Sequence, residues 1–357
     1  MPAALGLING LDRSEIETVN KHSIFRIPCR ATITLFILAW SSVAFCGLIH
    51  DAAKVGDLDK IKALIQSSPD SVNSKDTNGM TALHFASRNG LKDMVELLLA
   101  SKADVNATNR VGQTPLHVAV SAGAASPKAV ALLVIENKTK MNPSRTDVIE
   151  LLLQNKADVN AKDRWGETPL ESVLMLEDTP VAKLLLDNGA DPNARNLGGG
   201  TPLHGAAILG DENMIKFLLD YKADINATND NGETPLHLAA KENHKDLVNM
   251  LIANKANINA KNKYGQTALH VASTSALPDV LELLLSHGAE IDAKDNQGKT
   301  PLYWAASHGS RSNAEVLLAN KADVNARTKD GETPLQEALA WHYDDVAELL
   351  RQHGGHE

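Results

Sequence analysis

Five histidines recur at the same place in this sequence of 357 residues, three positions after a threonine. Each follows Thr-Pro-Leu or Thr-Ala-Leu, and they are His84, His117, His204, His237 and His270. Imidazole is the commonest metal ligand in proteins and the usual proton carrier near neutral pH. A histidine that returns along the chain could therefore mark a repeated metal site or a proton relay.

Two copies of the motif carry glutamate or glutamine at this place. They read Thr168-Pro-Leu-Glu171 and Thr333-Pro-Leu-Gln336. A capping box places glutamate or glutamine three positions after the first cap residue of a helix. The position thus accepts any polar group that bonds back to a helix start, so we interpret the histidines as structural. Tyr303, in the copy that begins at Thr300, fits the pattern less well and indicates a local difference of the surface.

Other patterns that carry chemistry are not found. The sequence has no HExxH, GxxxxGK[ST], GxSxG or GxGxxG motif. Aspartates recur at one position of the repeat and are read as turn residues: Asp104, Asp158, Asp191, Asp224 and Asp323. We therefore predict no catalytic residue, no metal and no cofactor. An enzyme with a site embedded in the array is the least favoured alternative.

The threonines define a repeat. They are Thr81, Thr114, Thr168, Thr201, Thr234, Thr267, Thr300 and Thr333, spaced by 33 residues except for one interval of 54. Each unit continues with an Ala-rich run, a Leu-rich run and an Asn/Asp-rich string. Threonine is a good helix cap and proline suits the first helical position, so each unit predicts a helix, a turn, a second helix and an extended finger. One such pair cannot bury its own apolar faces, so neighbouring units must stack.

This pattern resembles the ankyrin repeat family over residues 47–357. The resemblance implies an all-α solenoid of helix-turn-helix units with β-hairpin-like fingers, here nine repeats plus a half-repeat. The first unit starts near Ile49-His50, and a lysine replaces the usual left-handed glycine in five units. A non-glycine residue there costs roughly 1 kcal/mol.

The 54-residue interval contains an echo, because "NKTKMN" at residues 137–142 is followed by "NKADVN" at residues 155–160. We interpret the repeat that begins at Thr114 as complete, with Ser126-Pro127 starting its second helix. An irregular half-repeat would then follow at about residues 143–161. It is absorbed as a local bulge or forms a kink that shapes a binding notch.

In ankyrin repeats the fingers and first helices form a concave groove that binds other proteins. The resemblance therefore implies protein binding at the finger tips and first helices, where rings and arginines are typical anchors. The candidate residues are Arg110, Arg164, Trp165, Lys263 and Tyr264 on fingers, and Trp304 and Trp341 on first helices. Either tryptophan on a first helix could instead fill a gap between units.

The formal charge of −9 and the lack of a visible basic stripe argue against nucleic acid as a partner. Both cysteines, Cys29 and Cys46, precede the repeats. Residues 31–49 carry no charge and follow Lys21, Arg26 and Arg30, as in an export signal. We divide the chain into a tail, residues 1–30, a helical export signal or membrane anchor, residues 31–46, and the repeat domain. A buried helix that covers the first repeat is the alternative.

We predict a monomeric, non-catalytic module that binds an unidentified protein, is exported or tethered outside the cytoplasm, and can contact a membrane through residues 31–49. Glycans on the finger residues Asn106 and Asn226 would disturb the fold, which favours a bacterial periplasm over a eukaryotic secretory route. A secreted effector or inhibitor of another cell's protein is one alternative, and a cytoplasmic scaffold is another.

Overall fold

The computed structural model describes residues 47–122, 145–174, 178–275 and 277–357. All of them belong to one compact unit, Cys46–Glu357. A helical run over residues 47–55 comes first. The elements that follow are α3 (Leu58–Ser67), the 3-10 helix η1 (Pro69–Asn73), α4 (Ala82–Arg88), α5 (Lys92–Ala100), α6 (Pro115–Ser121), α8 (Arg145–Gln154), α9 (Pro169–Leu174), α10 (Thr179–Asp187), α11 (Pro202–Leu209), α12 (Glu212–Asp220), α13 (Pro235–Lys241), α14 (Lys245–Ala253), α15 (Ala268–Ala272), α16 (Asp279–Ser286), α17 (Pro301–Ser307), α18 (Arg311–Ala319), α19 (Pro334–Ala340) and α20 (Asp344–Gln352).

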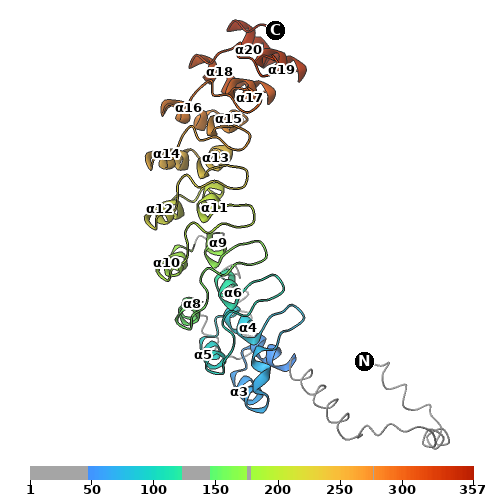
Figure 1. The fold of residues 1–357 in the computed structure, drawn as a ribbon, viewed down its shortest axis with the longest axis vertical. Helices are drawn as coiled ribbons and strands as arrows, with labels where there is room; N and C mark the ends of the chain where they lie inside the picture. The colour runs from blue at the N-terminus through green and yellow to red at the C-terminus, as the bar shows by residue number, and fades with distance from the viewer. Residues whose placement is uncertain (1–46, 123–144, 175–177, 276) are drawn as a thin grey trace, which may run out of the picture. The chain divides into compact units, whose positions relative to one another are not determined.

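The helices lie in two rows with the fingers on one side (Figure 1). The inner row holds the first helix of each unit, from α4 to α19, and the outer row holds the second, from α5 to α20. No β-strand occurs in the described ranges, so the finger turns carry no sheet of their own. This arrangement confirms the predicted all-α array of paired helices.

Each first helix begins as the sequence predicts. Thr114 has an extended backbone, its hydroxyl accepts a hydrogen bond from the amide of His117, and Pro115 takes the first helical position. Proline has no amide hydrogen to leave unpaired there. The same threonine cap precedes the other first helices with described caps.

Two leucine columns form the core between the rows. The outer helices bury Leu98, Leu152, Leu185, Leu218, Leu251, Leu284, Leu317 and Leu350, each with no exposed surface. The leucine after each proline or alanine of the inner helices is equally hidden, for example Leu203 and Leu269. Burying one leucine completely is worth roughly 1.5–3 kcal/mol. Because these columns run through every unit, stacking supplies the stability that a single helix pair lacks.

The fingers are joined to one another by backbone and side chain. The amide of Arg110 donates to the carbonyl of Asn78 at 2.9 Å, and the same bond recurs between later fingers. A second bond runs from the amide of Asp104 to the side-chain oxygen of Asn73 at 2.7 Å, and it too recurs once per unit. The recurring aspartates accept from the amide two residues later, as Asp104 does from Asn106. Their prediction as turn residues is therefore confirmed.

The long interval is arranged differently from the sequence interpretation. Helix α8, from the predicted half-repeat, packs on α5 and α6 as a regular second helix. The side chain of Asn106 accepts from the amide of Asp158 at 2.8 Å, so the finger after α8 stacks directly on the preceding one. The predicted second helix at Ser126-Pro127 falls within residues 123–144, outside the described residues. Residues 145–161 thus complete the unit of α6, because their "NKADVN" string supplies the finger contacts.

The five lysines that replace glycine do adopt the left-handed conformation, with φ between 64° and 71°. They are Lys102, Lys156, Lys222, Lys255 and Lys321, and the glycines Gly189 and Gly288 occupy the same position at 88° and 85°. The fold therefore tolerates the strain of a side chain there. Among the described residues no helix is long and apolar enough to cross a bilayer, and the apolar segment 31–46 lies outside them.

Candidate protein-binding surface

The recurring histidines join neighbouring units. The amide of Thr81 donates to Nδ1 of His84 at 3.1 Å, so that nitrogen acts as an acceptor. The opposite nitrogen, Nε2, then carries the hydrogen and donates to the carbonyl of Gln113 at 3.0 Å. His117, His204, His237 and His270 make the same two contacts, and burial lowers the pKa of each.

A metal ligand needs a free nitrogen lone pair, and here one ring nitrogen carries a hydrogen while the other is occupied. Within the described residues no group of three or more metal-binding side chains comes together. The carboxylate of Glu171 likewise accepts from the amide of Thr168 at 2.9 Å, and Gln336 does the same for Thr333. The structural interpretation of this position is therefore confirmed.

Exposed rings and cations stand on the finger tips, as predicted. Trp165 is 45% exposed and Tyr264 is 61% exposed. The guanidinium carbon of Arg164 lies 4.3 Å from the centre of the Trp165 ring, which holds the two side chains together as a cation–π pair. Arg110 and Lys263 are exposed, and their amides bond to the preceding finger.

Trp304 lies on the first helix α17 as predicted, whereas Trp341 follows α19 as its C-cap, and the two differ in setting. Trp304 is half-buried, stacks on His308 with ring centres 5.6 Å apart, and donates from Nε1 to Asp295 at 3.0 Å. Trp341 is 61% exposed and donates from Nε1 to Glu337 at 3.1 Å. Trp304 is fixed by three partners including Lys299, whereas most of the Trp341 ring faces solvent.

Tyr303 occupies the histidine position of its unit and is buried. Its hydroxyl lies 2.9 Å from a carboxylate oxygen of Glu332 and 2.8 Å from one of Glu337. Burial and these two carboxylates raise its pKa. The tyrosine thus reaches across to the following finger as the histidines do, but it ends at side chains instead of a backbone carbonyl.

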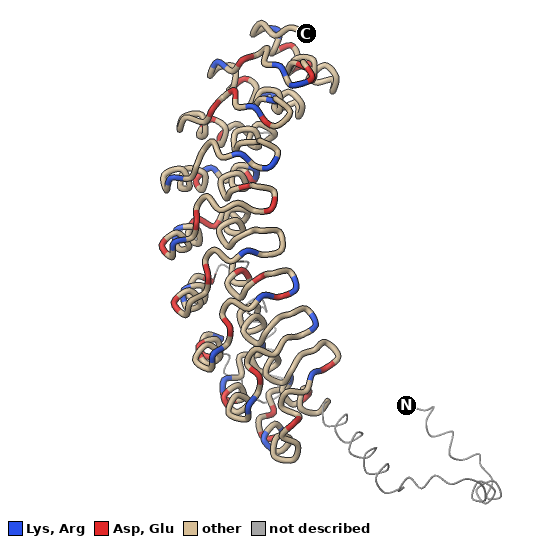
Figure 2. The backbone as a smooth tube through the Cα atoms, viewed as in Figure 1, with Lys and Arg blue, Asp and Glu red and all other residues tan. Residues whose placement is uncertain are grey.

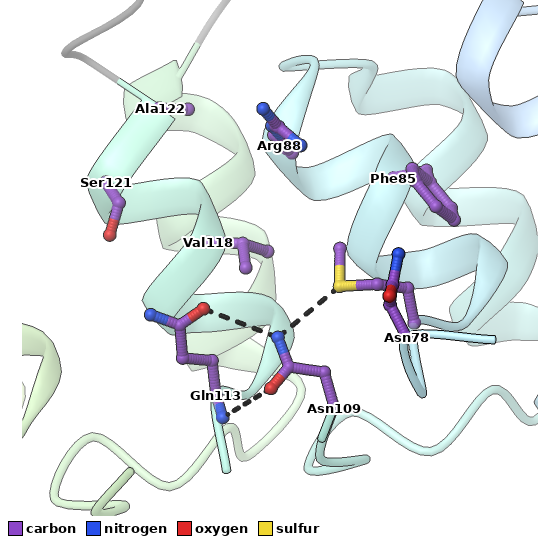
Figure 3. A pocket seen from close by; sticks show the side chains of 9 residues that line it. Asn78, Phe85, Arg88, Asn109, Gln113, Val118, Ser121 and Ala122 are labelled. Atoms are coloured by element: carbon purple, nitrogen blue, oxygen red, sulfur yellow. Dashed lines mark hydrogen bonds between the residues drawn. The ribbon is translucent and has the colours of Figure 1, made fainter. Parts of the chain in front are cut away.

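A hollow of about 580 Å³ lies between the second and third units (Figure 3). Phe85 and Val118 line it from α4 and α6. The side-chain nitrogen Nδ2 of Asn109 donates to Oε1 of Gln113 at 3.3 Å and to the sulfur of Met80 at 3.4 Å along one side. The lining combines the apolar side chains of Met80, Phe85, Val118 and Ala122 with the polar ones of Asn78, Arg88, Asn109, Gln113 and Ser121.

Three features of this surface were missed by the sequence analysis. Leu197 is 72% exposed at a finger tip, more than any other large apolar side chain described. The residues that line the hollow form no recognisable sequence motif, because they come from two neighbouring units. A row of basic residues along the fingers, which contradicts the expected lack of a basic stripe, is described below.

Comparisons with known proteins agree with this architecture. The family described as "Ankyrin repeats (3 copies)" matches residues 49–147, 141–229, 224–295 and 290–357. The chain is 31% identical over 132 residues to the transient receptor potential cation channel subfamily A member 1 homolog of Caenorhabditis elegans, covering 36% of this chain and 11% of the channel. It is 36% identical over 114 residues to the human neurogenic locus notch homolog protein 1, covering 28% of this chain and 4% of that protein. It is 48% identical over 68 residues to the serine/threonine-protein kinase 12 of Arabidopsis thaliana, covering 19% of this chain and 15% of the kinase. The chain thus spans a small part of each relative.

Proposed function

This chain belongs to the ankyrin repeat family, and from that premise we propose that residues 47–357 bind a protein partner without catalysing a reaction. The binding surface consists of the finger tips and the exposed sides of the first helices. The observation that carries this proposal is the set of exposed apolar side chains on fingers whose backbones are fixed to one another, namely Trp165, Leu197 and Tyr264.

Large apolar side chains that are exposed on the free protein contribute a favourable free energy to binding when a partner buries them. Trp165 and Tyr264 are also the residue types that contribute most at interfaces, since they bury a large area with little loss of rotamer freedom. Trp165 is already held by Arg164, so binding costs little ordering of that pair.

The proposal is tested with Trp165→Ala combined with Tyr264→Ala. Trp165 is 45% and Tyr264 61% exposed, so the double variant is expected to keep the melting temperature within about 2 °C. Binding to a partner isolated with the parent protein is expected to weaken by at least about tenfold. A matched control is Tyr221→Ala, which removes an aromatic side chain from the C-cap of the outer helix α12. If the double variant binds normally, the assignment of the surface is wrong.

We propose further that the repeats act outside the cytoplasm, supported by the uncharged residues 31–49 behind Lys21, Arg26 and Arg30. The side chains of Asn106 and Asn226 bond to the next finger at 2.8 Å, as expected for residues that no glycan can occupy without disturbing the fold. Fractionation and sequencing of the mature N-terminus test this. An uncleaved chain in the cytosolic fraction would favour the scaffold alternative, and recovery from a second cell type would favour the effector.

A further inference from the structure

Charge is unevenly distributed between the fingers and the rest of the protein. The eight fingers, residues 75–80, 108–113, 162–167, 195–200, 228–233, 261–266, 294–299 and 327–332, hold 11 basic and 8 acidic side chains, a balance of +3. The whole chain carries −9. In Figure 2 basic segments accordingly appear on the projecting loops. An acidic protein thus presents a basic edge.

The excess comes from the last three fingers. The first five contain five basic and five acidic side chains. The last three contain six basic residues, Lys261, Lys263, Lys294, Lys299, Arg327 and Lys329, against Asp295, Asp330 and Glu332. Two of these acids are already engaged, since Asp295 accepts from Trp304 and Glu332 lies against the Tyr303 hydroxyl.

One basic residue per finger forms a row in this region, which we call the basic row: Lys261, Lys294 and Arg327. Lys261 donates to the carbonyl of Lys294 at 2.9 Å, and Lys294 donates to that of Arg327 at 3.3 Å. Arg327 donates to the carbonyl of Gly331 in its own finger at 2.6 Å. All three are exposed, and within the described residues none forms an ion pair. Their positions are therefore fixed while their charges are not neutralised.

The equivalent residues of earlier fingers differ in surroundings. Lys75, Lys162 and Arg195 make the same bond to the next finger, at 2.7, 2.8 and 2.6 Å. Arg195 is paired with Asp230 at 3.3 Å, and Thr108 and Thr228 interrupt the series. Lys75, Lys162 and Arg195 therefore serve as a comparison for the basic row. They make the same bond to the next finger, but the first five fingers carry no net positive charge.

Aromatic side chains lie on the same units as the basic row, one of them exposed (Tyr264), one half-buried (Trp304) and one buried (Tyr303). Tyr264 lies at the tip next to Lys263, and Lys299 stands 5.0 Å from the Tyr303 ring centre and 5.6 Å from that of Trp304. Fixed cations beside aromatic side chains suit carboxylates separated by apolar or aromatic groups.

We propose that the fingers over residues 261–332 bind an extended, acidic segment of a partner protein, with about one carboxylate for each finger. This inference rests on the proposed protein-binding function and names its partner class. Packed helices lie roughly 8–10 Å apart, and an extended chain advances about 3.3 Å per residue. The matching segment therefore carries an acidic residue at about every third position.

Nucleic acid fits this surface less well. A duplex carries one charge per about 1.7 Å of its axis, far denser than one cation per finger. The rest of the chain has an excess of acidic side chains that would repel such a polyanion.

The test uses the full-length protein and fluorescent 15-residue peptides in an anisotropy titration at low ionic strength. One peptide has glutamate at every third position with serine, glycine and tyrosine between, and a second has the same composition with its glutamates in one block. The basic-row variant is Lys261→Gln, Lys294→Gln and Arg327→Gln together. The matched control is Lys75→Gln, Lys162→Gln and Arg195→Gln, which removes the same charge and the same kind of backbone bond.

The spaced peptide is expected to bind the parent more tightly than the block peptide, and the basic-row variant is expected to bind it about tenfold more weakly. The control is expected to stay within about twofold of the parent, and added salt should weaken binding. Equal loss in both variants, no binding by the parent, or tighter binding of a 15-nucleotide oligothymidine would each overturn the proposal. If a natural partner depends on Trp165 and Tyr264 but not on the basic row, the protein-binding function stands and this inference fails.

Discussion

The cap positions His84 and Glu171 predict opposite responses of stability to pH when each is replaced by glutamine. His84 has no exposed surface, and burial lowers its pKa from 6.5 to about 4. Burial likewise raises the pKa of Glu171 from 4.5 to about 7. Gln336 shows that glutamine serves this position, because its side-chain oxygen accepts from the amide of Thr333 at 2.9 Å.

For His84 the neutral ring is the stabilising form. Its contribution is fully present above pH 6.5, the unfolded value, and is lost as the pH falls from 6.5 towards 4. Linkage between these two pKa values makes the loss about 2 kcal/mol at pH 5 relative to pH 8. The variant His84→Gln cannot take up this proton, so it should gain about 2 kcal/mol on the parent when the pH is lowered from 8 to 5.

For Glu171 the protonated carboxyl is the stabilising form. Its contribution is present below pH 4.5 and is lost as the pH rises from 4.5 towards 7. Relative to acidic pH, where the group is protonated in both states, this titration lowers the free energy of unfolding by about 3 kcal/mol at pH 8 and by about 1 kcal/mol at pH 5. Glu171→Gln should therefore gain about 2 kcal/mol on the parent when the pH is raised from 5 to 8, the reverse of the histidine variant.

The assay is urea unfolding followed by circular dichroism at pH 5 and pH 8 for the parent and both variants. Comparing each variant with the parent at one pH cancels the other titrating groups, including the four remaining cap histidines. If both variants change in the same direction, or neither difference depends on pH, these two side chains are not held in the protonation states described.

Three further outcomes follow from the backbone and from one arginine. Lys255→Gly, at a φ of 71°, should raise the free energy of unfolding by about 1 kcal/mol, measured by urea titration, and a loss would mean that the lysine is not strained. Gly232→Ala should lower the melting temperature more than Gly331→Ala, because the added Cβ would lie 2.8 Å from the amide of Lys263, whereas at Gly331 it meets nothing within 4 Å; equal losses would contradict the close stacking of fingers. Arg145→Gln should cost about 2 kcal/mol in the same urea titration, since Arg145 donates to two carbonyls at the end of α6 and pairs with the α10 cap; an unchanged midpoint would contradict those contacts.

The sequence was sufficient for the helices, the caps and the tip residues, because each depends on residues within one unit. The threonine, proline and leucine of a unit act on their own helix, and Trp165 and Tyr264 are exposed because they precede a turn glycine. Contacts between units could not be obtained in this way. Residues 137–142 and 155–160 are almost equally good finger strings in the sequence. Contacts with the preceding unit show that residues 155–160 join the stack, among them the bond that the amide of Asp158 donates to Asn106.

The basic row was missed for a related reason. Lys261, Lys294 and Arg327 are 33 residues apart and look unremarkable in the sequence, but stacking brings them to the same edge. The exposure of Leu197 was also underestimated. It is large because the glycines that follow Leu197 have no side chains to cover it. In a stacked array, equivalent positions of successive units become neighbours in space. A surface that they form together cannot be recognised from residues that are adjacent in the sequence.

The direction of the histidine bonds has a consequence for how the protein is made. His84 donates to Gln113, His204 to Glu233 and His237 to Gln266, each a carbonyl 29 residues further along the chain, and His117 donates to Glu167, 50 residues further along. In a chain leaving the ribosome, the Nε2 hydrogen of a unit therefore faces water until the next finger has been synthesised. Each new finger then covers the histidine of the unit before it and completes its hydrogen bond.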